Sequence, residues 1–180
     1  MSRTSLAIAS SVVLALGACS DSGGGATTTT VTAATTTPAG APALRVDLVD
    51  DAVLAVEADL GGPQEYYEIN ATPALVNLFV AGAGGSVTAF VFVAGVLTSE
   101  ALTGEAGGAT FRADALAFDP ATVTSHVTSE LPTSRQDVFE IVGGPNGTVR
   151  YSIVVTSAVG GGQLIVQVDP DGTVLAVDPV

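Results

Sequence analysis

Glycine-rich breaks divide the C-terminal part of the chain into short apolar segments, and this division constrains the fold more than any other feature. The most prominent breaks are Gly82–Gly85, Gly143–Gly147, Gly160–Gly162 and Asp169–Gly172. The segments between them are rich in valine, and valine-rich segments bounded by glycine and proline are typical of β-strands. The predicted strands cover residues 65–69, 75–81, 87–93, 96–98, 109–118, 137–142, 148–156, 163–168 and 173–177. Short breaks favour antiparallel neighbours. Since the segment 96–98 is short and the pattern of 109–118 is mixed, we expect a mainly antiparallel sheet of about seven or eight strands.

Residues 47–60 are predicted to form a helix, because apolar residues recur on one face at helical spacing. These residues are Val49, Val53, Val56 and Leu60. Asp47 and its acidic neighbours lie at the N-terminal end, where the helix dipole favours negative charge. The glycines and proline of Gly61–Pro63 end the helix. A strand over residues 54–60 stays open as an alternative, since apolar residues also alternate there.

A second helix is predicted over residues 119–131. Asp119 is a good N-cap residue, and Pro120 suits the first helical position. Pro132 ends the run. Apolar residues repeat every four positions in between, namely Val123, Val127 and Leu131. Together, these elements predict an α+β fold in which two helices pack on a mainly antiparallel sheet.

The halves formed by residues 44–100 and 119–180 resemble each other, which predicts a tandem α-β-β-β duplication. Each half has a helix ending in leucine, and then a strand with the pattern acid, aromatic, Glu, Ile. The two strands are Glu65-Tyr66-Tyr67-Glu68-Ile69 and Asp137-Val138-Phe139-Glu140-Ile141. A second register, which pairs Gly61-Gly62-Pro63 with Gly143-Gly144-Pro145, stays open. Chance similarity between two strand-rich halves also stays open.

The composition excludes several classes of function. The chain has 18 acidic residues against five basic ones and a net charge of −13. A protein this acidic has no electrostatic footprint for nucleic acid, and an anionic bilayer would repel its surface. The single cysteine excludes an internal disulfide and a thiolate metal site. Residues 44–180 are numerous enough for one domain with its own core.

The start of the chain has the pattern of a secretory signal. Arg3 is followed by an apolar stretch, Leu6 to Ala18, and then by Cys19. The stretch is shorter than the ~20 apolar residues that span a bilayer, so we expect a cleaved signal rather than a transmembrane anchor. Residues 20–42 are rich in Thr, Gly and Ala and contain one large apolar residue, Val31, so we expect a flexible tether.

The residues Leu16-Gly17-Ala18-Cys19 resemble the lipobox of bacterial lipoproteins. In that family the cysteine thiol carries diacylglycerol, with fatty acyl chains such as palmitate, and the signal peptide is cut before it. The resemblance implies cleavage between Ala18 and Cys19, lipidation of Cys19, and a lipid-anchored protein on the extracytoplasmic side of a bacterial membrane. It divides the chain into a signal peptide (1–18), a lipidated cysteine with its tether (19–43) and an extracytoplasmic domain (44–180). An ordinary signal peptide is the alternative.

The segment Leu164–Leu175 resembles the last hairpin of PepSY domains, in which an apolar strand is followed by an Asp-x-x-Gly turn and Val-Leu. Here the turn is Asp169-Pro170-Asp171-Gly172. PepSY-like domains are small extracytoplasmic modules, often propeptides or inhibitors of proteases or parts of sensors, so the resemblance implies a protein partner. The whole arrangement also resembles mycobacterial lipoproteins that carry lipids in an apolar cavity, in architecture only.

Residues with catalytic chemistry are few. His126 is the only histidine, and no Gly-x-Ser-x-Gly nucleophile motif accompanies it. The spacing of Asp169–Gly172 fits a turn between strands better than an EF-hand calcium loop. Glu57, Asp59, Glu65 and Glu68 form an acidic group that a solvated surface explains. We therefore expect no enzyme activity, no metal site and no cofactor.

These observations predict a non-catalytic binding or interaction module, held on the membrane by the N-terminal lipid. Its expected partner is an extracytoplasmic protein. The alternative is a carrier of a lipid or another apolar ligand. A carrier needs an apolar cavity between the helices and the sheet, whereas a module has a filled interface there.

Overall fold

The computed structural model describes residues 42–158 and 160–180. The predicted signal peptide, the cleavage site at Ala18 and Cys19, and the tether up to residue 41 lie outside these residues. In the described part, no helix is both long and apolar enough to cross a membrane.

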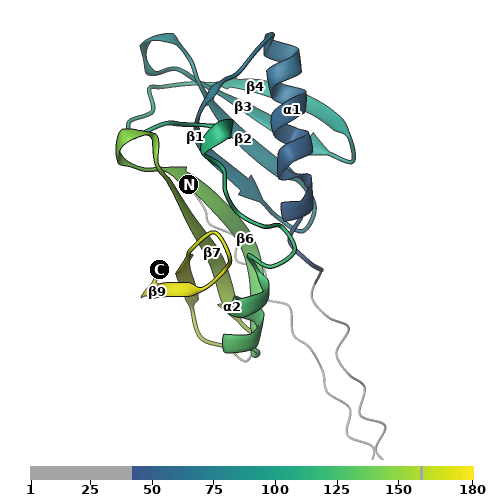
Figure 1. Ribbon diagram of the computed structural model, residues 1–180, viewed down its shortest axis with the longest axis vertical. Helices are drawn as coiled ribbons and strands as arrows, with labels where there is room; N and C mark the ends of the chain where they lie inside the picture. Colours follow the sequence, from purple (N-terminus) through teal and green to yellow (C-terminus); the bar gives the residue numbers. More distant parts are fainter. Residues whose placement is uncertain (1–41, 159) are drawn as a thin grey trace, which may run out of the picture. The chain divides into compact units, whose positions relative to one another are not determined.

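Within this part of the chain, nine strands form one antiparallel sheet, so the fold is α+β. The order across the sheet is β4-β3-β2-β1-β6-β7-β8-β9, and β5 pairs with β1 outside this path. Each half of the order is a meander, and β1 and β6 join the two at the centre (Figure 1). The strands are β1 (Glu65–Ala71), β2 (Val76–Ala81), β3 (Val87–Val93), β4 (Val96–Leu102), β5 (Phe111–Arg112), β6 (Ser134–Gly143), β7 (Val149–Ser157), β8 (Gln163–Val168) and β9 (Val174–Pro179).

The strands follow the valine-rich segments between the glycine breaks closely. β3 and β8 have the predicted bounds. The predicted segment 96–98 is only the start of β4, because the two-residue turn at Ala94-Gly95 lets the chain pair along all of β3. The expected number of seven or eight strands was therefore too low.

The predicted strand over residues 109–118 is wrong for most of its length. Only β5 pairs with another strand there. Ala113–Ala115 then forms a 3-10 turn, closed by the amide of Leu116 donating to the carbonyl of Ala113 at 3.1 Å. This bend brings both aromatic residues of the segment into the protein: Phe111 is buried, and Phe118 packs on other aromatic rings. A straight strand would send alternate residues to opposite faces.

The first predicted helix is confirmed. A 3-10 turn over Val46–Leu48 leads into α1 (Val49–Leu60). Gly61 ends the helix with a φ of 80°, which glycine adopts without strain. The predicted apolar face is buried at Val49, Val53 and Val56. Leu60 is 45% exposed, contrary to the prediction, because it is the last residue before the chain turns away at Gly61.

The second helix, α2 (Ser125–Glu130), is shorter than predicted. Asp119 is not its N-cap. The carbonyl of Asp119 instead accepts the amide of Val123 at 2.9 Å, which makes a turn before the helix. The amide of Asp119 donates to the carbonyl of Pro170, far along the chain, so tertiary contacts shape this segment. Val123 and Val127 are fully buried, as predicted.

One face of the sheet forms the core. Because side chains alternate along a strand, every second residue of the central strands enters this core, while those between lie on the opposite face, which we call the outer face. Buried core residues of the sheet include Ile69, Leu78, Phe90, Phe139, Ile141, Ile153 and Val166, and α1 contributes Val49, Ala52, Val53 and Val56. Residues of the outer face are mostly half-buried or exposed, and the half-buried ones include Asn70, Asn77, Phe79, Glu140, Val142, Ser152 and Ile165.

Candidate binding cleft on the outer face of the sheet

A row of polar side chains crosses the middle of the outer face. The row follows directly paired residues on neighbouring strands from β2 to β8, which are Asn77, Asn70, Glu140, Ser152 and Gln167. Apolar side chains flank it, among them Val142 and Ile165. Strand residues that serve only packing are mostly β-branched or aromatic, so a polar row at the centre of a sheet marks this surface as a candidate binding site.

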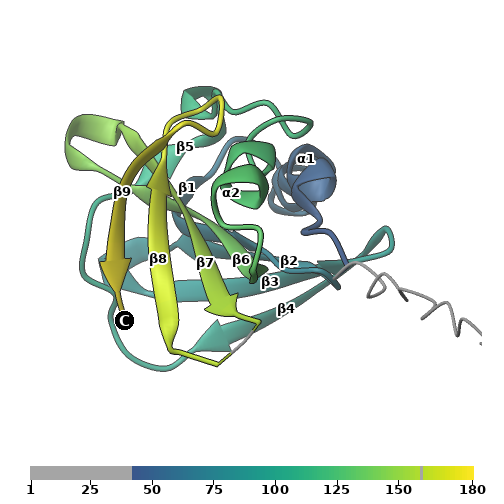
Figure 2. The same cartoon turned by 90° about the horizontal axis from the view of Figure 1, so that it is seen from below.

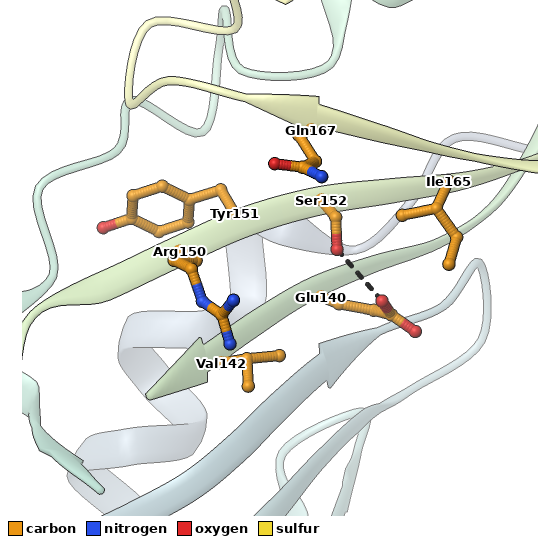
Figure 3. Close-up of a pocket in the computed structure, with 7 residues that line it drawn as sticks. All are labelled: Glu140, Val142, Arg150, Tyr151, Ser152, Ile165 and Gln167. Carbon is orange, nitrogen blue, oxygen red and sulfur yellow. Dashed lines mark hydrogen bonds between the residues drawn. The ribbon is translucent and has the colours of Figure 1, made fainter. Parts of the chain in front are cut away.

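A cleft of about 210 Å³ lies over β6, β7 and β8 at one end of this row. It is lined by Glu140, Val142, Arg150, Tyr151, Ser152, Ile165 and Gln167. Figure 3 shows that the Tyr151 ring points away from Glu140 and Ser152, which agrees with its burial in the core. Pockets for drug-sized ligands measure about 300–1,000 Å³. The cleft therefore suits one side chain of a partner better than a large ligand.

Glu140 is the half-buried acid of this cleft. The hydroxyl of Ser152 donates a hydrogen bond to its carboxylate at 3.0 Å (Figure 3). Burial raises the pKa of Glu140 above its usual value, the bond from Ser152 opposes this shift, and the charge of nearby Glu68 adds to it. The Glu140 carboxylate is therefore held with less solvation than it would have in water, and a donor or a cation from a partner would stabilise it.

Arg150 supplies a positive charge to the same cleft. Its side chain is exposed and lies over Val142 in Figure 3. No ion pair joins it to any described residue, whereas Arg45, Arg112 and Arg135 each have an acidic partner. In a chain with so many acids, an arginine without one is available to a carboxylate from outside. Glu140 and Arg150 together offer both an acceptor and a bidentate donor.

Asn70, the neighbour of Glu140 on β1, has an unused acceptor. Its Oδ1 atom is buried and has no hydrogen-bond partner among the described residues. A buried acceptor without a donor costs about 1–3 kcal/mol. The polar row therefore contains hydrogen-bonding capacity that the fold itself does not use.

The residues with catalytic or metal-binding chemistry in the sequence do not form a site together. His126 is exposed on α2. Both aspartates of the Asp169–Gly172 turn are used by the turn, as predicted: Asp169 accepts the amides of Asp171 and Thr173, and Asp171 accepts the hydroxyl of Thr173 at 2.7 Å. No group of three or more possible metal ligands occurs within residues 42–158 and 160–180.

Three of the four acids named from the sequence make different contacts, and the fourth, Asp59, is exposed on α1. Glu57 accepts the amide of Gln64 at 3.3 Å, and Glu65 accepts the hydroxyl of Thr110 at 2.8 Å. Glu68 lies on the outer face, opposite Val142. Of this group, only Glu68 comes near the cleft.

The residues of the cleft are not among the site residues that the sequence predicts. Their only signal was the presence of polar residues at alternate positions of three valine-rich strands, such as Glu140, Ser152 and Gln167. Alternation shows that residues share a face of one strand. It does not show which residues of neighbouring strands lie opposite each other, and that register is what assembles the row.

Comparison of the chain with protein-family models, with curated proteins and with solved structures found no match.

Proposed function

We propose that this chain is a lipid-anchored extracytoplasmic lipoprotein whose folded part is a non-catalytic binding module. The observation that carries the anchoring is the run Leu16-Gly17-Ala18-Cys19 at the end of a short apolar stretch. Lipidation at Cys19 would hold the protein on the membrane, since its acidic surface would not.

Packing between α1 and the sheet favours a module over a lipid carrier. Val49, Ala52 and Val56 of α1 are fully buried. They belong to the same cluster as the large side chains of the central strands, including Phe90, Phe139, Ile69 and Ile141, all at most 1% exposed. A carrier would need empty volume at this position, several hundred Å³ for an acyl chain.

The proposed module is a tandem duplication with both helices on one side of the sheet. Figure 2 shows α1 and α2 seen along their axes, and buried residues of both belong to one core. The strand order supports the duplication, because each half is a helix followed by a four-strand meander, one strand more than the predicted unit. The equivalent strands β1 and β6 pair with each other at the centre of the sheet, where Ile69 lies opposite Ile141. The other register is disfavoured, because Gly61–Pro63 precedes β1 whereas Gly143–Pro145 follows β6.

The outer face is the proposed binding surface. Its cleft combines Glu140, the apolar Val142 and Ile165, and Arg150, which forms no ion pair with any described residue. A protein side chain with a polar end and an apolar stem could contact the charged groups and the apolar groups of the cleft at the same time. The resemblance of the C-terminal hairpin to PepSY domains agrees with a protein partner on this face.

Anchoring is tested by Cys19→Ala in the native host. The variant should leave the membrane fraction or accumulate as an uncleaved precursor. Mass spectrometry of the wild-type protein should find a mature N-terminus at Cys19 with added acyl mass. An unmodified N-terminus at another residue would contradict lipidation.

The choice between module and carrier is tested on the Cys19→Ala variant, because it lacks the anchor lipid. After purification, its bound lipid is extracted and quantified, and its melting is followed with and without added fatty acid. A module contains no stoichiometric lipid, and its melting temperature does not change. A carrier melts higher with lipid, since a ligand of the native state raises stability.

The binding surface is tested by comparing crosslinked partners in cell-envelope preparations. Arg150→Ala and Glu140→Gln should both abolish a crosslink that the wild type forms. Arg112→Ala is the matched control, because Arg112 is exposed but pairs with Glu65 outside the cleft. Crosslinks that persist in both cleft variants would exclude this surface.

A further inference from the structure

One end of the sheet is an open edge. Among the described residues, β4 pairs with β3 on one side only, and it is the last strand in the order (Figure 1). Six of its seven residues are exposed, and Val96 is 63% exposed. The strand contains no glycine, proline or lysine, and Glu100 is its one charged residue. Natural edge strands are usually protected by such residues, because unpaired backbone groups attract another strand. At the opposite edge, β9 ends in Asp178-Pro179.

The turn before β4 determines which of its backbone groups are free. Ala94 and Gly95 both have positive φ values, 48° and 85°, as in a two-residue hairpin turn of type I′. Such a turn makes the flanking pair, Val93 and Val96, a hydrogen-bonded pair. By alternation, Val96, Thr98, Glu100 and Leu102 direct their backbone groups to β3. The amides and carbonyls of Leu97, Ser99 and Ala101 then point outward.

We propose that β4 pairs antiparallel with β4 of a second copy of this chain, with a two-fold axis at Ser99. This register places Ser99 opposite Ser99 of the second copy and Leu97 opposite its Ala101. All three outward residues then form hydrogen-bonded pairs, which gives about six backbone hydrogen bonds between the copies. The pairing uses all seven residues of β4 and extends the sheet continuously across the axis.

The side chains of β4 are self-complementary in this register. On the outer face, Val96 meets Leu102 of the second copy, and Thr98 meets its Glu100. The apolar pair covers two side chains that are 63% and 42% exposed in the single chain. The Thr98 hydroxyl faces the carboxylate of the opposite Glu100, and no two glutamates lie directly opposite each other. Apolar and polar cross-strand pairs of this kind each stabilise a sheet by about 0.2–1 kcal/mol. Moving the axis to Leu97 or Ala101 would leave four residues of each β4 without a partner in the other β4.

The net charge predicts how the pairing responds to salt. Each copy is strongly acidic, so the two repel each other at long range. Salt screens exposed charges that lie farther apart than about 8–10 Å. Added salt should therefore strengthen the association, whereas docking of a basic partner strand on the same edge would weaken with salt.

The register is tested by Ser99→Cys in the full-length chain, solubilised in mild detergent and treated with a mild oxidant. Opposite residues of a hydrogen-bonded pair have Cα atoms about 5.5 Å apart, within the range of a disulfide. Rapid crosslinking to a covalent dimer is expected. Thr98→Cys should crosslink slowly, because the two Thr98 residues are diagonal neighbours. The unsubstituted chain measures any dimer formed through Cys19, the only native cysteine.

The edge itself is tested by Ser99→Pro, which removes an outward amide and leaves the bonds to β3 in place. The mass in solution, measured by light scattering, should fall from dimer to monomer, with a dissociation constant raised about tenfold or more by the two lost bonds. Ala101→Pro is the second variant, and far-UV circular dichroism and the melting temperature check that both remain folded. A wild-type chain that stays monomeric at its highest soluble concentration would overturn the proposal. So would a dimer unaffected by either folded proline variant, or faster crosslinking through Thr98→Cys.

Discussion

Ile69 of β1 lies directly opposite Ile141 of β6 at the centre of the sheet, and both side chains are fully buried. Their strands, β1 and β6, pair with each other and so connect the two meanders of the described sheet. In the proposed duplication, these two residues are equivalent to each other. Both side chains belong to the same buried cluster, so the two halves have one common core at this pair.

Ile69→Val and Ile141→Val should each lower the free energy of unfolding by about 0.5–1.5 kcal/mol, because each removes a buried methylene group. The double variant should deviate from additivity, since residues in contact are coupled. Denaturant unfolding measures all three. Ile165→Val is the control, because Ile165 is half-buried on the outer face and should cost less. A larger loss at Ile165 would contradict the assignment of the core to the other face.

Removing the hydroxyl group should lower the stability of the protein at Tyr151 but not at Tyr66. The Tyr66 hydroxyl is buried without a hydrogen-bond partner among the described residues, so Tyr66→Phe should leave stability unchanged or raise it by about 1 kcal/mol. The Tyr151 hydroxyl accepts the amide of Ala117 at 3.0 Å, so Tyr151→Phe should lower stability by about 1 kcal/mol. Thermal melting distinguishes the two. Equal destabilisation by both would show that Tyr66 has a partner.

Gly143 is required by a close approach of two backbone segments. A Cβ atom at this position would lie 2.2 Å from the carbonyl oxygen of Ala109. Gly143→Ala should therefore displace the segment that leads into β5 and lower the free energy of unfolding by about 1–3 kcal/mol, as overpacking does. Gly107→Ala is the matched control, because a Cβ there has no neighbour within 4 Å. Similar melting temperatures for both variants would contradict this contact.

The contribution of Glu140 to the free energy of unfolding should fall as pH rises. Burial raises the pKa of its carboxyl in the folded state above the usual 4.5, so the folded chain binds this proton more tightly than the unfolded chain. The resulting stabilisation is fully present below pH 4.5 and is lost as pH rises through the raised pKa. Glu140→Gln, which mimics the protonated acid, should be more stable than the wild type at neutral pH and equally stable in acid.

This comparison is made by urea unfolding across the pH range, with Glu105→Gln as a control on an exposed loop. The control variant should follow the wild type at every pH. If Glu140→Gln destabilised the protein at neutral pH, the ionised carboxylate would be favourable in the fold, and the assigned direction of its pKa shift would be wrong.

Local patterns were sufficient to predict most strands and α1. The glycine and Asp-Gly breaks determine where strands end, because turns need the backbone conformations that glycine adopts. The valine-rich stretches of β3 and β8 were therefore found with their bounds. The segment around Asp119 was predicted less well, since Asp119 and Gly172 make contacts between distant segments: a Cβ on Gly172 would lie 2.6 Å from the carbonyl of Val123. Local propensity contains no information on such contacts.

The sequence by itself determined the α+β class and most of the strand segments, since each depends on residues adjacent in the chain. It also predicts a membrane anchor at Cys19, which lies outside the described residues. The tertiary structure alone decided the order of the strands, the pairing of β1 with β6, and the open edge at β4. It also brought Glu140, Arg150 and Gln167 together in one cleft. The physical reason is register: alternation gives each residue a face, but hydrogen bonds between strands decide which residues become neighbours on it.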